Sequence, residues 1–131
     1  MFFLGVVFAS TVFTRPTTVR RYELVPLWSW KVILQTHSRK MIKVVLLNCL
    51  LLFPMGLLLP LAAGRKLRLS LAFLAGFLVS AVIETSQLIT KRGLFEWDDM
   101  VHNALGCMAG CLVMQLLQGV VKWIRRKREI L

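Results

Sequence analysis

Three long stretches of apolar residues, at 44–63, 69–90 and 100–121, constrain this chain more than any other feature. Each is at least 20 residues long, and Glu84 is the only formally charged residue within them. Twenty residues of α-helix rise about 30 Å, which is the thickness of the hydrocarbon core of a bilayer. The sequence therefore predicts an all-α fold, an integral membrane bundle with three transmembrane helices.

The remaining segments are shorter or more polar. Residues 1–14 are apolar but would rise only about 21 Å as a helix, so we predict a short fourth helix there. Residues 15–43 form a basic connection whose apolar, aromatic middle, 24–30, is predicted to lie at the membrane interface or to re-enter the membrane. Residues 122–131 are predicted to form a basic C-terminal tail. We expect all of these segments to belong to one membrane domain, 1–131.

The composition agrees with a membrane protein. An apolar content of 57% and a mean hydropathy of +0.70 would leave a soluble domain of this size with large exposed apolar patches. The net charge of +11 invites a nucleic-acid interpretation. However, the basic residues stand in short clusters that flank the apolar stretches, where phospholipid headgroups lie. We therefore predict the lipid bilayer as a partner, and no nucleic acid.

The basic clusters also bear on orientation. The connections 15–43 and 91–98 lie at one face of the predicted bundle and carry nine Lys and Arg residues. The turn 64–68 and the tail 122–131 lie at the opposite face and carry eight, crowded directly against helix ends. Such crowding is typical of the cytoplasmic side. We therefore expect a cytoplasmic C-terminus, and we expect the 91–98 end to face outward.

Polar residues of three predicted helices fall at one depth, close to the face of the 15–43 and 91–98 connections. They are Asn48 near the start of one helix, Glu84 and Gln87 near the end of the next, and Asp98, Asp99, His102 and Asn103 at the start of the last. Helical spacing groups them with small residues on two stripes, Gly76, Ser80, Glu84 and Gln87, and Asp99, Asn103, Gly106 and Gly110. Small residues let helices approach closely, so we expect both stripes to face the bundle interior.

Glu84 has two interpretations. A carboxylate at membrane depth is costly unless it is paired, hydrated or protonated. It could mark a site for a substrate or a proton, with Arg92 folding back as its partner. It could instead belong to a structural clasp between helices. Asp98 and Asp99 could likewise serve only to complement the dipole of their own helix.

The sequence contains no pattern that predicts a cofactor or a metal ion. His102 lies near several carboxylates, but no metal-site spacing such as HExxH accompanies it. Cys49, Cys107 and Cys111 lie in apolar stretches without a CxxC pair, so we expect buried thiols that pack against their neighbours. We therefore predict no metal and no cofactor at this site.

Ordered motifs over about 22–118 resemble the VanZ-like family. They are Asn48 followed by Leu52-Phe53-Pro54-Met55-Gly56, then Ser80-x-x-x-Glu84-x-x-Gln87, then Arg92-x-x-Phe95-Glu96-x-Asp98-Asp99-x-x-x-Asn103-x-x-Gly106-x-x-x-Gly110. The chain departs from the family pattern at 23–27, which reads Glu-Leu-Val-Pro-Leu where Asn-Leu-x-Pro-Phe is usual. It also has Glu96 where an Asp is usual, and a shorter first helix.

The resemblance implies a multi-pass protein of the bacterial cell membrane. The founding member of the family is associated with resistance to teicoplanin, a lipoglycopeptide, and not with an established enzymatic activity. Carried over position by position, the family pattern falls on the polar residues Asn48, Glu84, Gln87, Arg92, Asp98, Asp99 and Asn103. The resemblance thus points to the residues that the depth argument selects.

Three functions remain open from the sequence. We favour a non-enzymatic protein whose polar site recognises a lipid headgroup, a cell-wall precursor or a glycopeptide. The second is an enzyme that acts on a lipid-linked envelope substrate with Glu84 or Asp99 as acid or base, although no nucleophile–base pair is visible. The third is a small proton-coupled transporter, which the one-sided clustering of polar residues disfavours. The sequence does not indicate an oligomeric state.

Overall fold

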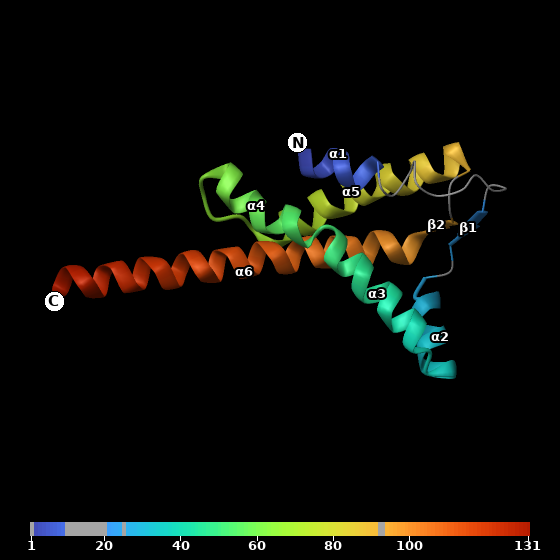
Figure 1. Cartoon of the computed structure of the whole chain (residues 1–131), viewed down its shortest axis with the longest axis horizontal. Coiled ribbons are helices and arrows are strands. Elements are labelled where there is room, and N and C mark those ends of the chain that lie inside the picture. The colour runs from blue at the N-terminus through green and yellow to red at the C-terminus, as the bar shows by residue number, and fades with distance from the viewer. Residues whose placement is uncertain (1, 10–20, 25, 92–93) are drawn as a thin grey trace.

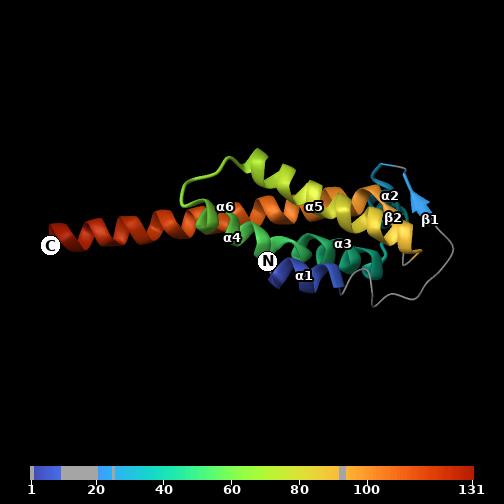
Figure 2. The same cartoon turned by 90° about the horizontal axis from the view of Figure 1, so that it is seen from above.

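The computed structural model describes residues 2–9, 21–24, 26–91 and 94–131. In chain order its elements are α1 (Phe2–Phe8), β1 (Arg21–Glu23), α2 (Trp28–Thr36), α3 (Arg39–Leu51), α4 (Phe53–Ala63), α5 (Leu69–Thr90), β2 (Leu94–Glu96) and α6 (Trp97–Ile130). Helix α6 is the centre of the bundle, because α3, α4 and α5 all pack against it (Figures 1 and 2).

Three helical segments of the described chain are long and apolar enough to cross a membrane. They are Arg39–Ala63, Leu69–Thr90 and Trp97–Ile130. The prediction of an all-helical bundle with three such helices is therefore confirmed. Many large apolar side chains on the outside of these helices are exposed, as a lipid-facing surface requires.

The first of these segments is broken in the middle. Helix α3 ends at Leu51, and Leu52 joins it to α4, which has Pro54 in its first turn. Proline has no N–H to donate to the carbonyl four residues earlier, and its ring crowds that carbonyl. The break at Leu52 is therefore a local consequence of Pro54. Leu52 is fully buried, so the break lies inside the bundle.

Helix α6 continues well beyond the predicted span 100–121. Its 34 residues run without interruption to Ile130, through the segment predicted to be a tail. Residues 120–130 contain no Gly or Pro and are rich in Lys and Arg, which are good helix formers. Lys127 and Arg128 in the last turn also complement the helix dipole. The C-terminal turns therefore project from the bundle as a single helix (Figure 1).

The predicted short N-terminal helix is present as α1, which covers seven residues. Its Val7 packs into a buried cluster with Leu52, Ile83 and Cys107. Residues 10–14, which the prediction included, lie outside the described residues. Helix α1 lies beside the middle of the bundle in both views (Figures 1 and 2).

Glycines allow α6 to approach its neighbours closely. A Cβ atom at Gly106 would collide with the backbone carbonyl of Cys49 in α3, and one at Gly110 would collide with that of Phe53 in α4. Gly56 of α4 meets the backbone of Cys107 in the same way. The small-residue stripe of α6 therefore faces the interior, as the helical spacing predicted.

A pair of parallel strands, which the sequence analysis did not predict, closes one end of the bundle. Strand β1 pairs with β2, with Tyr22 opposite Phe95. Because β2 runs directly into α6, this pairing brings the chain before α2 to the start of α6. Helix α2, which includes the last three residues of the aromatic segment 24–30, lies at the same end (Figure 1).

Candidate polar site at the strand end of the bundle

The polar residues predicted to share one depth are gathered at the end closed by β1 and β2. Of the polar side chains named in the sequence analysis, those that are 9% exposed or less are Ser80, Glu84, Gln87, Asp98, Asp99, His102 and Asn103. Asn48 is half-buried at the same level. Arg92, the predicted partner of Glu84, lies outside the described residues. We call this set, without Arg92, the polar cluster.

Asp98 connects the start of α6 to the start of α2. Its two carboxylate oxygens accept hydrogen bonds from the backbone N–H groups of Leu27 (2.7 Å) and Ser29 (3.0 Å). The first N–H groups of a helix have no partner within that helix, so a carboxylate placed there caps it. Leu27 itself has no capping side chain and adopts a left-handed conformation. The sequence interpretation of Asp98 as a dipole charge of its own helix is therefore incomplete, because Asp98 caps a different helix.

Asp99 connects α6 to α3. The side-chain amide of Asn48 donates a hydrogen bond to the Asp99 carboxylate across 51 residues of sequence. Asn48 lies one residue before Cys49, whose carbonyl is in contact with Gly106. The close backbone approach at Gly106 and the polar bond at Asp99 therefore hold the same pair of helices together, about two turns apart on α6.

Glu84 connects the end of α5 to the start of α6. Its carboxylate accepts a 3.1 Å hydrogen bond from the backbone N–H of Glu96, the residue that precedes α6. One turn earlier on α5, the Ser80 hydroxyl accepts a 2.7 Å hydrogen bond from the Asn103 amide. Gln87 is buried one turn after Glu84 on the same face. The predicted stripe of α5 therefore faces α6 along the depth of the cluster.

His102 has a partner that the sequence analysis missed. The indole N–H of Trp30 in α2 donates a 3.0 Å hydrogen bond to His102 Nε2, so the neutral ring carries its proton on Nδ1. Trp30 belongs to the segment 24–30, predicted to lie at the membrane interface or to re-enter the membrane, and its side chain is 44% exposed. An indole is apolar with one donor, which suits a boundary between lipid and a buried acceptor. No spacing in the sequence links Trp30 to a residue 72 positions later.

The hydrogen bonds of the cluster carboxylates favour a role in anchoring neighbouring elements over a role in exchanging protons with solvent. Glu84, Asp98 and Asp99 each accept a hydrogen bond from an N–H donor of another element. Charge-assisted bonds of this kind are among the stronger hydrogen bonds in proteins. Within the described part of the chain, no three His, Cys, Asp or Glu side chains are close enough together to hold a metal ion.

Comparison with known proteins decides the family. The model of the family VanZ/LLP1 matches residues 1–118. The chain belongs to the VanZ/LLP1 family. The match confirms the resemblance carried by the polar motifs, and it extends upstream of 22–118 to include α1. No curated protein and no solved structure matches the chain.

Membership in VanZ/LLP1, together with the three long apolar helices, makes the chain a multi-pass membrane protein in contact with the lipid bilayer.

Two departures from the family motifs, at Glu23 and Glu96, lie next to each other in the structure. They are Cα partners in the register of β1 and β2. Glu23 and Glu96 therefore both belong to the strand pair that closes the bundle at the polar cluster.

Proposed function

We propose that this VanZ/LLP1 protein lowers the susceptibility of the bacterial cell envelope to glycopeptides of the teicoplanin type, acting at its strand end on the outer face of the cell membrane. The supporting observation is the polar cluster, in which buried side chains of α5 and α6 and the half-buried Asn48 of α3 meet at one level of an otherwise apolar bundle. Polar groups at membrane depth are costly and are characteristic of functional sites.

The burial of the cluster indicates how it acts in this proposal. Glu84 and Asp98 are less than 5% exposed, so they do not themselves form an open binding surface. They hold β2 and α2, and exposed residues lie in or beside these elements at the same end: Trp30 in α2, Leu24 directly after β1, and Trp97 directly after β2 at the start of α6. Recognition of a lipid headgroup, a cell-wall precursor or the glycopeptide itself would use that presented surface.

The central experiment measures teicoplanin susceptibility of bacteria that express the protein. We expect Glu84→Gln and Asp99→Asn to abolish protection, because each weakens an acceptor that positions the presented surface. Glu129→Gln is the matched control, since Glu129 is exposed near the opposite end of α6. All three variants are checked for normal amounts in the membrane fraction. Wild-type protection by both cluster variants would refute the proposal.

A second experiment tests the outward orientation. In a background that lacks Cys49, Cys107 and Cys111, Lys91→Cys places a thiol on an exposed residue at the strand end. We expect an impermeant maleimide to label it in intact cells. The control Arg126→Cys, on the projecting part of α6, should be labelled only after permeabilisation. The reverse pattern would place the strand end in the cytoplasm.

A further inference from the structure

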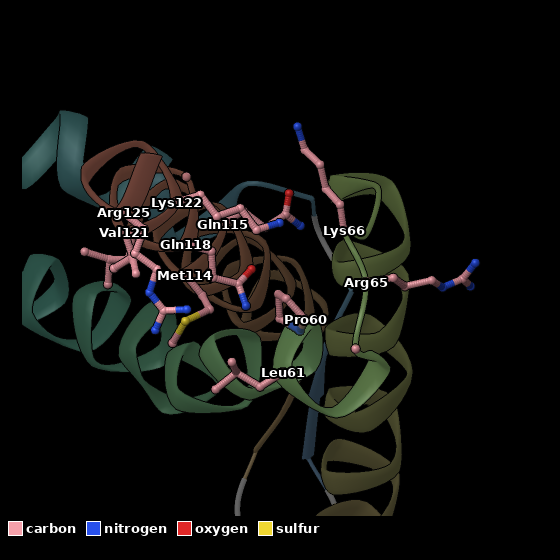
Figure 3. A pocket seen from close by; sticks show the side chains of 13 residues that line it. Pro60, Leu61, Arg65, Lys66, Met114, Gln115, Gln118, Val121, Lys122 and Arg125 are labelled. Atoms are coloured by element: carbon pink, nitrogen blue, oxygen red, sulfur yellow. The ribbon is translucent and has the colours of Figure 1, made fainter. Parts of the chain in front are cut away.

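A groove lies at the other end of the bundle, away from the polar cluster. It has a volume of about 720 Å³ and opens between the end of α4, the turn that follows it and the part of α6 beside them (Figure 3). Pro60, Leu61 and Met114 contribute apolar surface. The side chain of Gln118 points into the space between α6 and Pro60 (Figure 3). The groove thus combines an apolar wall with a hydrogen-bonding amide.

The rim of the groove is strongly basic. Arg65 and Lys66 come from the α4–α5 turn, and Lys122 and Arg125 come from α6. The described residues that line it include no acidic side chain. Five of the six acidic residues of the chain lie at the strand end or in the polar cluster, which leaves Glu129 as the acidic residue on this side. The electrostatic field at the groove is therefore positive and suited to an anion.

The groove also lies at the depth of phospholipid headgroups. Helix α5 has 22 residues and rises about 33 Å, close to the thickness of the hydrocarbon core, so its two ends mark the two interfaces. The α4–α5 turn lies at the interface opposite the strand end. Its position against α6 is held by Gln115, which donates a 2.7 Å hydrogen bond to the carbonyl of Leu67.

Apolar side chains continue from the groove toward the middle of the membrane. Leu58 and Leu61 of α4 and Leu117 of α6 are each more than half exposed on the lipid-facing surface. A molecule with an anionic head and long apolar chains would therefore match both parts of the surface. Its phosphate would lie among the rim cations, and its acyl chains would lie along α4 and α6.

We propose that this groove binds one phospholipid with an anionic headgroup, taken from the leaflet at the α4–α5 turn. Lys122 and Arg125 on α6 contact the phosphate, and Gln118 hydrogen-bonds the headgroup, whereas Arg65 and Lys66 on the turn, whose side chains extend away from α6, add positive charge at the rim (Figure 3). This site is independent of the strand end and of the proposed role in glycopeptide susceptibility. The bound lipid would fix the turn against α6 where that helix leaves the bundle.

The test is lipid retention by the purified full chain, measured by native mass spectrometry during titration with phosphatidylglycerol and phosphatidylcholine of equal chain length. We expect one phosphatidylglycerol to be retained in preference to phosphatidylcholine. Lys122→Gln combined with Arg125→Gln should lower the affinity roughly 30-fold, as expected for two lost lipid-facing cations. The matched control, Arg126→Gln with Arg128→Gln, removes two charges of α6 that do not line the groove.

Gln118→Phe supplies a variant that fills the groove without changing its charge. We expect this variant also to lose preferential retention, by about tenfold or more, because the bulky ring occupies the headgroup space. Equal losses of phosphatidylglycerol affinity in the Lys122/Arg125 variant and in the Arg126/Arg128 variant would show diffuse attraction to anionic lipids. That result would overturn the proposal. Equal retention of the two lipids, or occupation by inorganic phosphate in place of the lipid, would also overturn it.

Discussion

The Asp98 carboxylate at the start of α6 accepts a hydrogen bond from the backbone N–H of Ser29, 69 residues earlier in the sequence. This bond, with its companion to Leu27, makes the first turn of α6 the cap of α2. Asp99, the next residue, is bonded to Asn48 of α3. Two adjacent carboxylates thus hold two different helices, which is why the start of α6 organises the strand end.

Asp98→Ala should release the first turn of α2. Loss of a capping side chain costs about 1–2 kcal/mol, and the two backbone N–H groups at Leu27 and Ser29 lose their acceptor. We expect faster hydrogen–deuterium exchange of peptides that cover α2, with little change in α5. Glu129→Ala removes an exposed carboxylate from the same helix and should leave exchange in α2 unchanged. Unaltered exchange in Asp98→Ala would contradict the capping role.

Two neighbouring tryptophans of α2 should respond differently to the same substitution. Trp30→Phe removes the donor to His102 Nε2 and leaves a buried acceptor, which costs about 1–3 kcal/mol. Within the described part of the chain, the buried Nε1 of Trp28 has no hydrogen-bond partner. Trp28→Phe therefore removes an unsatisfied donor and should be much milder. Thermal unfolding in detergent compares the two, and equal destabilisation would count against the Trp30–His102 bond.

The bond between Ser80 and Asn103 can be measured by a double-mutant cycle. Ser80→Ala, Asn103→Ala and the double variant are compared by thermal unfolding in one detergent. Because both side chains are fully buried and bonded at 2.7 Å, we expect a coupling free energy of about 1 kcal/mol. Additive effects of the two substitutions would show that α5 and α6 are not joined through this pair.

Gly106 should be far less tolerant of a methyl group than Gly119 on the same helix. A Cβ at Gly106 collides with the Cys49 carbonyl, whereas a Cβ at Gly119 meets nothing within 4 Å. We expect Gly106→Ala to destabilise the protein by at least about 2 kcal/mol, because two helix backbones must separate. Gly119→Ala should be neutral or stabilising, since alanine is the better helix former. Similar unfolding temperatures for the two variants would refute the close approach.

The sequence by itself determined the features that depend on local composition and helical spacing. Apolar runs of 20 or more residues must be helical in a bilayer, because every backbone polar group has to be satisfied within its own segment. The bounds of α5 therefore agree with the predicted span 69–90. The same spacing predicted that Ser80, Glu84 and Gln87 share an inward face, and all three are buried.

Only the tertiary structure decided which partner each polar group has. The sequence left open whether Asp98 only complements the dipole of its own helix, and the structure shows that it caps α2 and that His102 bonds Trp30, because the pairing of β1 with β2 brings distant segments together. The groove at the other end depends in the same way on α6 continuing as a helix past α4. Contacts between residues some 70 positions apart leave no periodic signal in a single sequence, so packing of the whole chain was needed to reveal them.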